Sequence, residues 1–211
     1  FWLVALLCVL YYSAIFPFQK YAINMLQCNL GYTAEQAGLV FFVFPLGAAA
    51  ITPLLGNFLD RKGKGASMLM VGAILMVICH LVFALVLPAL EGAIAVAVAY
   101  LSIILLGISF SLVPAALWPS VPKLVENKLL GSAYAVIFWI QNIGLYAFPM
   151  IIGAVLRSSN PGVTNPLEYN YTVPMLVFAS LGILAFILGL FLKIEDKKKG
   201  YGLELPNIQK D

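Results

Sequence analysis

"GNFLDRKGKG", residues 56–65, places four charged side chains among three glycines. The chain around this segment is 63% hydrophobic and only 10% charged. Charged side chains are costly inside a hydrocarbon layer, so a cluster of them is expected in a loop outside it. The segment therefore predicts a turn that joins two membrane-spanning helices.

The composition of the whole chain points to the same class of protein. Its mean hydropathy is +1.00, whereas a soluble domain carries about a quarter charged residues to cover its surface. A helix needs roughly 20 apolar residues to cross the hydrocarbon core, and the chain contains six such runs. The predicted fold class is therefore all-α integral membrane, followed by a cytoplasmic tail at residues 194–211. The expected transmembrane helices are residues 1–27, 34–58, 66–87, 92–122, 129–156 and 172–193.

Basic residues predict the orientation, because Lys and Arg stay on the cytoplasmic side during membrane insertion. With these spans, ten of the 12 Lys and Arg residues fall on one side, and the opposite loops hold only Arg157. Both ends of the chain are therefore expected to be cytoplasmic. The tail shows no lysosomal sorting pattern, which favours the plasma or inner membrane over the lysosome. The ten residues are Arg61, Lys62, Lys64, Lys123, Lys128, Lys193, Lys197, Lys198, Lys199 and Lys210.

Prolines divide the six predicted helices into two kinds. In each half of the chain two helices that contain proline are followed by one without, because residues 66–87 and 175–193 have none. Bent helices are tolerated where neighbours or a watery cavity satisfy the freed carbonyls, whereas smooth apolar helices suit a lipid-facing rim. The pattern predicts a 3+3 repeat, which is common in secondary transporters. The prolines are Pro17, Pro45, Pro53, Pro114, Pro119 and Pro149.

The loop between the second and third helices also carries a family pattern. Residues 56–63 match Gly-x-x-x-Asp-Arg-x-Gly, and a basic residue follows. In pattern and in place this loop resembles that of the major facilitator superfamily, although Gly65 stands where a second basic residue is usual. The resemblance implies half of a twelve-helix fold, and a transporter that works by alternating access rather than an enzyme. The implied latch residues are Gly56, Asp60, Arg61, Lys62, Gly63 and Lys64.

Asp60 ends the predicted second helix, where the helix dipole disfavours an anion by a few tenths to about 1 kcal/mol. We therefore expect it to have a partner, which Arg61, Lys62 or the N-terminus of a neighbouring helix can supply. Gly56 would permit close helix approach, and Gly63 a tight reversal. In the superfamily this loop latches one half of the protein against the other.

The expected partners follow from that resemblance. They are the lipid bilayer, a small-molecule substrate, and either a missing N-terminal six-helix half or a second copy of this chain. The sequence begins inside a membrane segment, so we expect it to be a fragment.

Three further stretches resemble one branch of the same superfamily, which includes dipeptide transporters. One is Tyr11-Tyr12 with Phe16-Pro17-Phe18, and the others are LLGISFSLVPAALWPSV at 105–121 and LLGSAYAVIFWIQNIGL at 129–145. The resemblance implies a carrier of dipeptides or similar small zwitterions. It also makes Tyr12 a candidate for substrate binding.

On the first helix, Ser13, Pro17, Lys20 and Asn24 fall at spacings of four, three and four, so they share one stripe. We expect this stripe to face a cavity or another helix, and Ser13, Lys20 and Asn24 are candidate substrate ligands. Lys20 has two interpretations at this stage. It either snorkels to the outer interface or offers a counter-charge to a substrate carboxylate.

The fourth and fifth helices supply the other candidates. Ser111 and Trp118 lie along one side of the fourth helix, where Trp118 could contact substrate or anchor at the interface. Gln141 and Asn142 lie well inside the fifth span, where unsatisfied amides are costly. Adjacent residues point about 100° apart, so only one amide is expected to face a cavity. The two alternative faces are Trp139, Asn142 and Tyr146, or Tyr134, Phe138 and Gln141.

His80 is the single histidine, and it lies in the third helix. An intramembrane titratable group suggests either proton coupling or plain packing, and packing is favoured because Glu35, in the first turn of its span, is the single acidic residue within the spans. Cys8, Cys28 and Cys79 show no metal-ligand or disulfide spacing. No metal, cofactor or nucleic-acid partner is indicated.

Two other functions compete with transport. A scaffold or receptor would have a packed centre without a solvated polar stripe. An intramembrane serine protease would use a serine in a Gly-x-Ser setting, as at Gly107 and Ser109, but Phe110 replaces the usual glycine and His80 precedes the serine.

Overall fold

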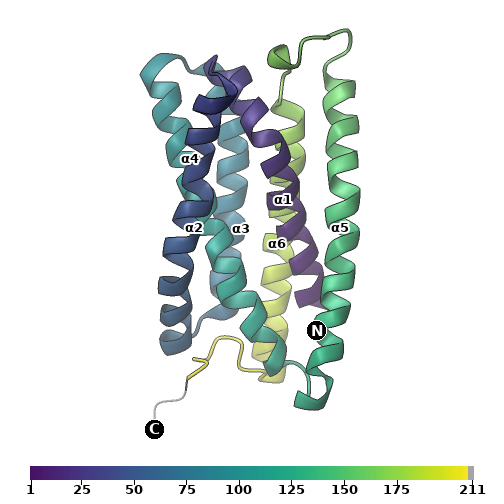
Figure 1. The fold of residues 1–211 in the computed structure, drawn as a ribbon. Helices are drawn as coiled ribbons and strands as arrows, with labels where there is room; N and C mark the ends of the chain where they lie inside the picture. The colour runs from purple at the N-terminus through teal and green to yellow at the C-terminus, as the bar shows by residue number, and fades with distance from the viewer. Residues whose placement is uncertain (209–211) are drawn as a thin grey trace.

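The computed structural model describes residues 1–208, in which six long helices account for most of the chain (Figure 1). Lys210, which the orientation argument included, lies outside the described residues. All six helices, with the short turns that extend them, are long and apolar enough to cross a membrane. The long helices are α1 (Trp2–Leu30), α2 (Ala34–Lys62), α3 (Gly65–Leu81), α4 (Gly92–Ser120), α5 (Leu130–Ser159) and α6 (Thr172–Lys199).

The helices pair in a symmetrical way. Helices α3 and α6 pack against each other, while α2 packs on α4 and α5 packs on α1. In Figure 1, α2 and α5 stand at opposite sides of the bundle. Exchanging the first three helices for the last three reproduces this pattern, as a 3+3 repeat requires. This arrangement agrees with the fold class that the sequence predicted, a six-helix bundle built as a 3+3 repeat.

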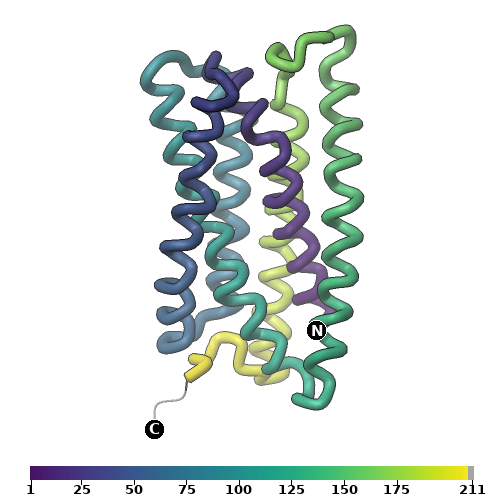
Figure 2. Tube along the Cα trace, in the orientation of Figure 1, coloured from purple at the N-terminus to yellow at the C-terminus, as the bar shows by residue number. Residues whose placement is uncertain are grey.

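Successive helices run antiparallel, so the loops gather at two ends (Figure 2). The α1–α2, α3–α4 and α5–α6 connections lie at the upper end. The lower end holds the α2–α3 and α4–α5 connections, the N-terminus and the chain after α6. Arg61, Lys62, Lys64 and Lys128 therefore share the lower end with the basic last turn of α6. This is the separation of charge that the sequence predicted.

Turn chemistry fixes the α1–α2 junction. Gly31 ends α1 in a left-handed conformation with φ of 65°, and its N–H donates to the Gln27 carbonyl. Thr33 then opens α2 through a capping box, in which Gln36 N donates to Thr33 Oγ1 at 3.3 Å and Thr33 N donates to Gln36 Oε1 at 3.0 Å. The two helices therefore reverse direction in three residues.

The irregular part of the bundle lies just before Pro88, not at the prolines inside the helices. Helices α1, α2, α4 and α5 are continuous through their prolines. The helix expected to be smooth instead changes to a π-helical turn, η1 (Val82–Val86), followed by the 3-10 turn η2 (Leu87–Ala89). Thr172 of α6 donates its hydroxyl to the Ala84 carbonyl at 3.2 Å, which satisfies a carbonyl of that turn. The expectation of a uniformly regular third helix was wrong, because its last residues form a π-helical turn and a 3-10 turn.

The last helix is longer than the expected span. Helix α6 continues to Lys199, whereas the expected span ended at residue 193. Gly200 then ends the helix with φ of 68°. The extra turn carries Lys197, Lys198 and Lys199, where cations favour the helix dipole.

Helix α1 lies at the centre of the bundle, and Tyr11 and Phe18 are fully buried on it. The Tyr11 hydroxyl donates to the Leu69 carbonyl of α3, so the buried phenol is satisfied. By contrast, the exposed faces of α3 and α6 carry apolar side chains such as Ile78 and Ile187. Those two faces suit contact with lipid tails.

The α1–α5 contact depends on Gly144. A Cβ at this position would collide with Ser13 Oγ and would lie 2.9 Å from Val9 Cγ1. We expect Gly144→Ala to lower the free energy of unfolding by about 1–3 kcal/mol through overpacking. Gly131→Ala is the matched control, because nothing lies within 4 Å of its Cβ position on the same helix. Thermal unfolding of the full-length protein in detergent measures both, and equal melting temperatures would contradict the close contact.

Candidate substrate-binding site

Aromatic side chains from three helices meet in the lower half of the bundle. Tyr12 of α1 stacks on Phe16 with 5.2 Å between ring centroids, and it meets the edge of Trp118 at 6.3 Å. Trp118 of α4 in turn lies 5.0 Å from Phe138 of α5 and 6.0 Å from Tyr134. We call these five residues the aromatic cluster. Such rings can contact apolar side chains or bind a cation on their faces.

A groove between α1 and α5 adjoins the aromatic cluster. Its volume is about 380 Å³, and its lining residues are Phe16, Pro17, Gln19, Lys20, Leu145 and Pro149. Phe16 belongs to both the groove and the aromatic cluster, so the two features form one continuous surface.

Lys20 supplies the charge of this surface. It is exposed in the groove, and it forms none of the salt bridges found within residues 1–208. It lies four residues from the middle of α1, which is roughly 6 Å along the axis, and about 15 Å from the end of the helix. Lys20 is therefore nearer the middle of the span than its end, and an unpaired ammonium there favours a ligand of opposite charge.

Ser13 and Gln141 do not line the groove. Ser13 is fully buried against Gly144, and its hydroxyl has no partner among the described residues. Gln141 is also buried, and its Oε1 accepts a hydrogen bond from Cys8 Sγ at 3.3 Å. Both side chains lie in the α1–α5 contact, because the close approach at Gly144 closes that part of the helix pair. For this reason neither side chain is part of the proposed substrate-binding surface.

Asn24 and Ser111 also have structural partners. Asn24 Oδ1 accepts a hydrogen bond from the Tyr171 hydroxyl at 2.6 Å, which ties α1 to the start of α6. Ser111 is fully buried and donates to the Gly107 carbonyl of its own helix at 2.8 Å. Its hydroxyl also lies 3.4 Å from the Ala48 carbonyl of α2. We therefore leave both residues out of the proposed substrate-binding surface.

The two alternative faces of α5 have different environments. Tyr134 and Phe138 point to the aromatic cluster, as described above. Trp139, Asn142 and Tyr146 point away from the bundle, with Trp139 68% and Tyr146 73% exposed. Asn142 donates to the Phe138 carbonyl at 2.8 Å, which satisfies part of its amide. These three side chains therefore leave this face of α5 uncovered within residues 1–208.

Some residues of this surface were missed from the sequence. Phe16, Gln19, Leu145 and Pro149 were not among the candidate ligands. Tyr12, Phe16 and Lys20 are four residues apart and lie on one side of α1. That four-residue spacing is the sequence signal for this surface, whereas the expected stripe ran through Ser13 and Pro17.

The latch loop has partners inside the chain. Asp60 forms none of the salt bridges within residues 1–208; its Oδ1 accepts a hydrogen bond from Asn207 Nδ2 at 2.8 Å instead. Thus neither Arg61 nor Lys62 pairs with it, contrary to expectation. Gly56 faces open space rather than a close helix, whereas Gly63 reverses the chain with φ of 73°.

His80 is packed among aromatic rings. Its Nδ1 lies 2.8 Å from the Met76 carbonyl, which can only accept, so Nδ1 carries the proton. Phe18 and Phe178 lie 5.2 and 5.4 Å away by ring centroids. Ser109, the serine of the protease alternative, donates to the Gly72 carbonyl at 2.7 Å and not to His80. Ser109 and His80 therefore do not form the nucleophile and base of a serine protease.

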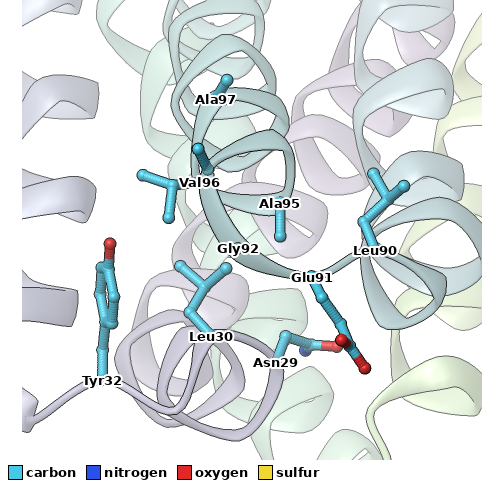
Figure 3. A pocket seen from close by; sticks show the side chains of 10 residues that line it. Asn29, Leu30, Tyr32, Leu90, Glu91, Gly92, Ala95, Val96 and Ala97 are labelled. Atoms are coloured by element: carbon cyan, nitrogen blue, oxygen red, sulfur yellow. The ribbon is translucent and has the colours of Figure 1, made fainter.

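A second hollow lies at the upper end (Figure 3). It has a volume of about 610 Å³ and lies between the end of α1, Tyr32 and the start of α4. Asn29 and Glu91 supply its polar side chains. None of the candidate substrate ligands lines it.

Comparison with known proteins agrees with this arrangement. The family model of the Major Facilitator Superfamily matches residues 1–206. The chain therefore belongs to the Major Facilitator Superfamily, which is a family of transporters and not of enzymes.

Among curated proteins, the chain is similar to the lysosomal dipeptide transporter MFSD1 of several vertebrates. It is 32% identical to the protein of Danio rerio over 157 residues, 31% to that of Bos taurus over 157, and 30% to that of Homo sapiens over 159. Each match covers 74% of this chain and 31–32% of the relative. The chain thus spans about a third of the length of the curated relatives that it matches.

The environment of His80 generates a prediction. We expect His80→Gln to leave the pH profile of uptake by the full-length protein unchanged, because no carboxylate among the described residues is placed to exchange a proton with this ring. Uptake by proteoliposomes across a range of external pH measures it. A shifted or flattened profile would restore the proton-coupling interpretation.

Proposed function

We propose that the chain is one half of a carrier that moves a small solute across a membrane by alternating access. One observation carries the proposal. The stripe of Tyr12, Phe16 and Lys20 joins the aromatic cluster and the groove into one polar and aromatic surface, which is continuous with exposed α5. In hydrocarbon such a surface would be costly, whereas it suits the wall of a watery route. The groove also argues against a scaffold with a packed, dry centre.

The substrate class follows from the chemistry of that surface. The Lys20 ammonium suits a carboxylate, and the faces of Tyr12 and Trp118 suit an ammonium group or an apolar side chain. Lys20 and Tyr12 are eight residues apart, which is about 12 Å along a helix. A dipeptide spans about 7 Å of backbone, and side chains at both ends reach inward. We therefore propose a dipeptide or similar zwitterion, and the names of the relatives, which are dipeptide transporters, support this choice.

A second six-helix body would complete the route. Helices α2 and α5 are the least buried of the six, and they stand at opposite sides of the bundle (Figure 1). We propose that their exposed faces meet either an N-terminal six-helix half or a second copy of this chain. The share of the relatives that the chain covers supports the first of these.

Orientation and compartment also remain proposals. Basic residues at the lower end support a cytoplasmic position for both ends of this chain. The expected plasma or inner membrane gains no support from the relatives, whose names place them in the lysosome. Imaging of a tagged full-length protein with markers for both membranes decides the compartment.

Lys20 provides the test of the proposed site. In proteoliposomes that contain the full-length protein, we expect Lys20→Met to reduce dipeptide uptake by at least about tenfold, the cost of losing one charge-assisted contact. Lys20→Arg should keep part of the activity, because it keeps the charge. Lys128→Met is the control, since this exposed lysine pairs with Glu126 in a loop. Uptake by Lys20→Met at the wild-type rate would overturn the proposed substrate contact.

A further inference from the structure

The chain after α6 turns back under the bundle rather than leaving it. Gly200 ends α6, and the following residues cross the lower end toward α2 (Figure 2). Leu203 is only 1% exposed and belongs to the hydrophobic core. Residues 200–208, which we call the strap, are therefore anchored in the fold.

The backbone of the strap pairs with the α2–α3 loop. Lys64 N donates to the Glu204 carbonyl at 2.9 Å, and Gly65 N donates to the Leu203 carbonyl at 3.1 Å. A Cβ at Gly63 would overlap the backbone of residues 204–206, and one at Gly65 would lie 2.8 Å from the Leu203 carbonyl oxygen. The glycines of this loop thus make the surface on which the strap lies.

Glu204 of the strap caps α3. Lys64, the N-cap residue, offers no side-chain hydrogen bond. Instead Glu204 Oε1 accepts from Ser67 N at 2.7 Å, and Oε2 accepts from Ser67 Oγ at 2.7 Å. Lys193 of α6 donates to the same Ser67 hydroxyl at 2.8 Å. A carboxylate is favourable at a helix N-terminus, so Glu204 fixes the strap to α3.

The strap also ties three other helices together. Lys123, in the turn that follows Pro119 and the end of α4, donates to the Gly202 and Leu205 carbonyls at 3.0 and 2.8 Å. Asp196 of α6 accepts from Leu203 N at 3.0 Å. Asn207 and Ile208 N donate to the side chain and the carbonyl of Asp60 at the end of α2. None of the hydrogen bonds that residues 200–208 form within the described part of the chain reaches α1 or α5.

We propose that the strap is an intramolecular lock, which holds the lower ends of α2, α3, α4 and α6 as one unit. The strap must release Lys123 before the end of α4 can move away from α5. The role in a transport cycle rests on the proposed function, but the lock itself does not. The α4 end is the part that needs restraint, because Pro119 removes a hydrogen bond from its last turn. In the structure the end of α4 contacts α5 through a hydrogen bond, in which the Tyr134 hydroxyl donates to the Trp118 carbonyl at 3.3 Å.

Hydrogen exchange and cysteine labelling of the full-length protein in detergent test the lock. We expect Glu204→Ala to raise amide exchange in residues 64–68 by about tenfold, because these amides lose a charged cap and a backbone partner. Glu195→Ala is the matched control, since Glu195 lies at the same end of α6 and, within residues 1–208, forms ion pairs only with Lys198 and Lys199. Unchanged exchange in Glu204→Ala would overturn the strap contact.

The labelling experiment uses a reporter that the strap does not touch. Ala133 on α5 is 6% exposed, next to Tyr134. In an Ala133→Cys background, we expect Glu204→Ala and Lys123→Met to raise the rate of labelling by a water-soluble maleimide by about tenfold. Lys123→Met leaves the cap of α3 intact, so it separates release of α4 from unfolding of the loop. Labelling of both variants at the wild-type rate would overturn the lock. Failure of the wild-type protein to transport would count only against the proposed function.

Discussion

Hydrocarbon offers no hydrogen-bond partner to a peptide group, and this constraint shapes the whole chain. Each span must satisfy its own backbone within a helix, so the six helices differ only in what their side chains present. Where the helical pattern changes, a side chain supplies the missing partner, as Thr172 does for the π-turn at Ala84. A polar side chain therefore either forms hydrogen bonds with the backbone and with neighbouring helices, or it remains available to line a route for solute.

That distinction sorts the polar residues of this chain. Three polar side chains already have hydrogen-bond partners within the bundle, namely those of Ser111, Ser109 and Asn24. Lys20 is left over, together with the aromatic rings of Tyr12 and Trp118. The close contact at Gly144 separates the two sets, since it closes the part of the α1–α5 pair that contains Ser13 and leaves the groove open farther along. A single small residue thus decides which face of α1 is enclosed and which is open.

The loop at residues 56–65 has one partner within this chain and an expected partner outside it. The superfamily pattern implies a latch to another six-helix body, whereas the strap occupies Asp60 and the glycines within this chain. Both uses rely on the same physical features, which are an anion at the end of a helix and a backbone without side chains beside it. Competition between these partners would connect the position of the strap to the position of the second half.

The sequence by itself determined the number of helices, their alternating direction, the charged end and the family, because hydropathy, basic residues and the Gly-x-x-x-Asp-Arg pattern are local signals. It also made Lys20, Trp118 and Tyr12 candidate ligands, and these three remain in the proposed substrate-binding surface. Helical spacing shows which residues share a face, but it does not show what lies opposite that face. Only the tertiary structure decided that Ser13 and Gln141 are enclosed while Lys20 is open. It alone revealed the strap, since Glu204 and Ser67 are 137 residues apart and neither belongs to a pattern that points to the other.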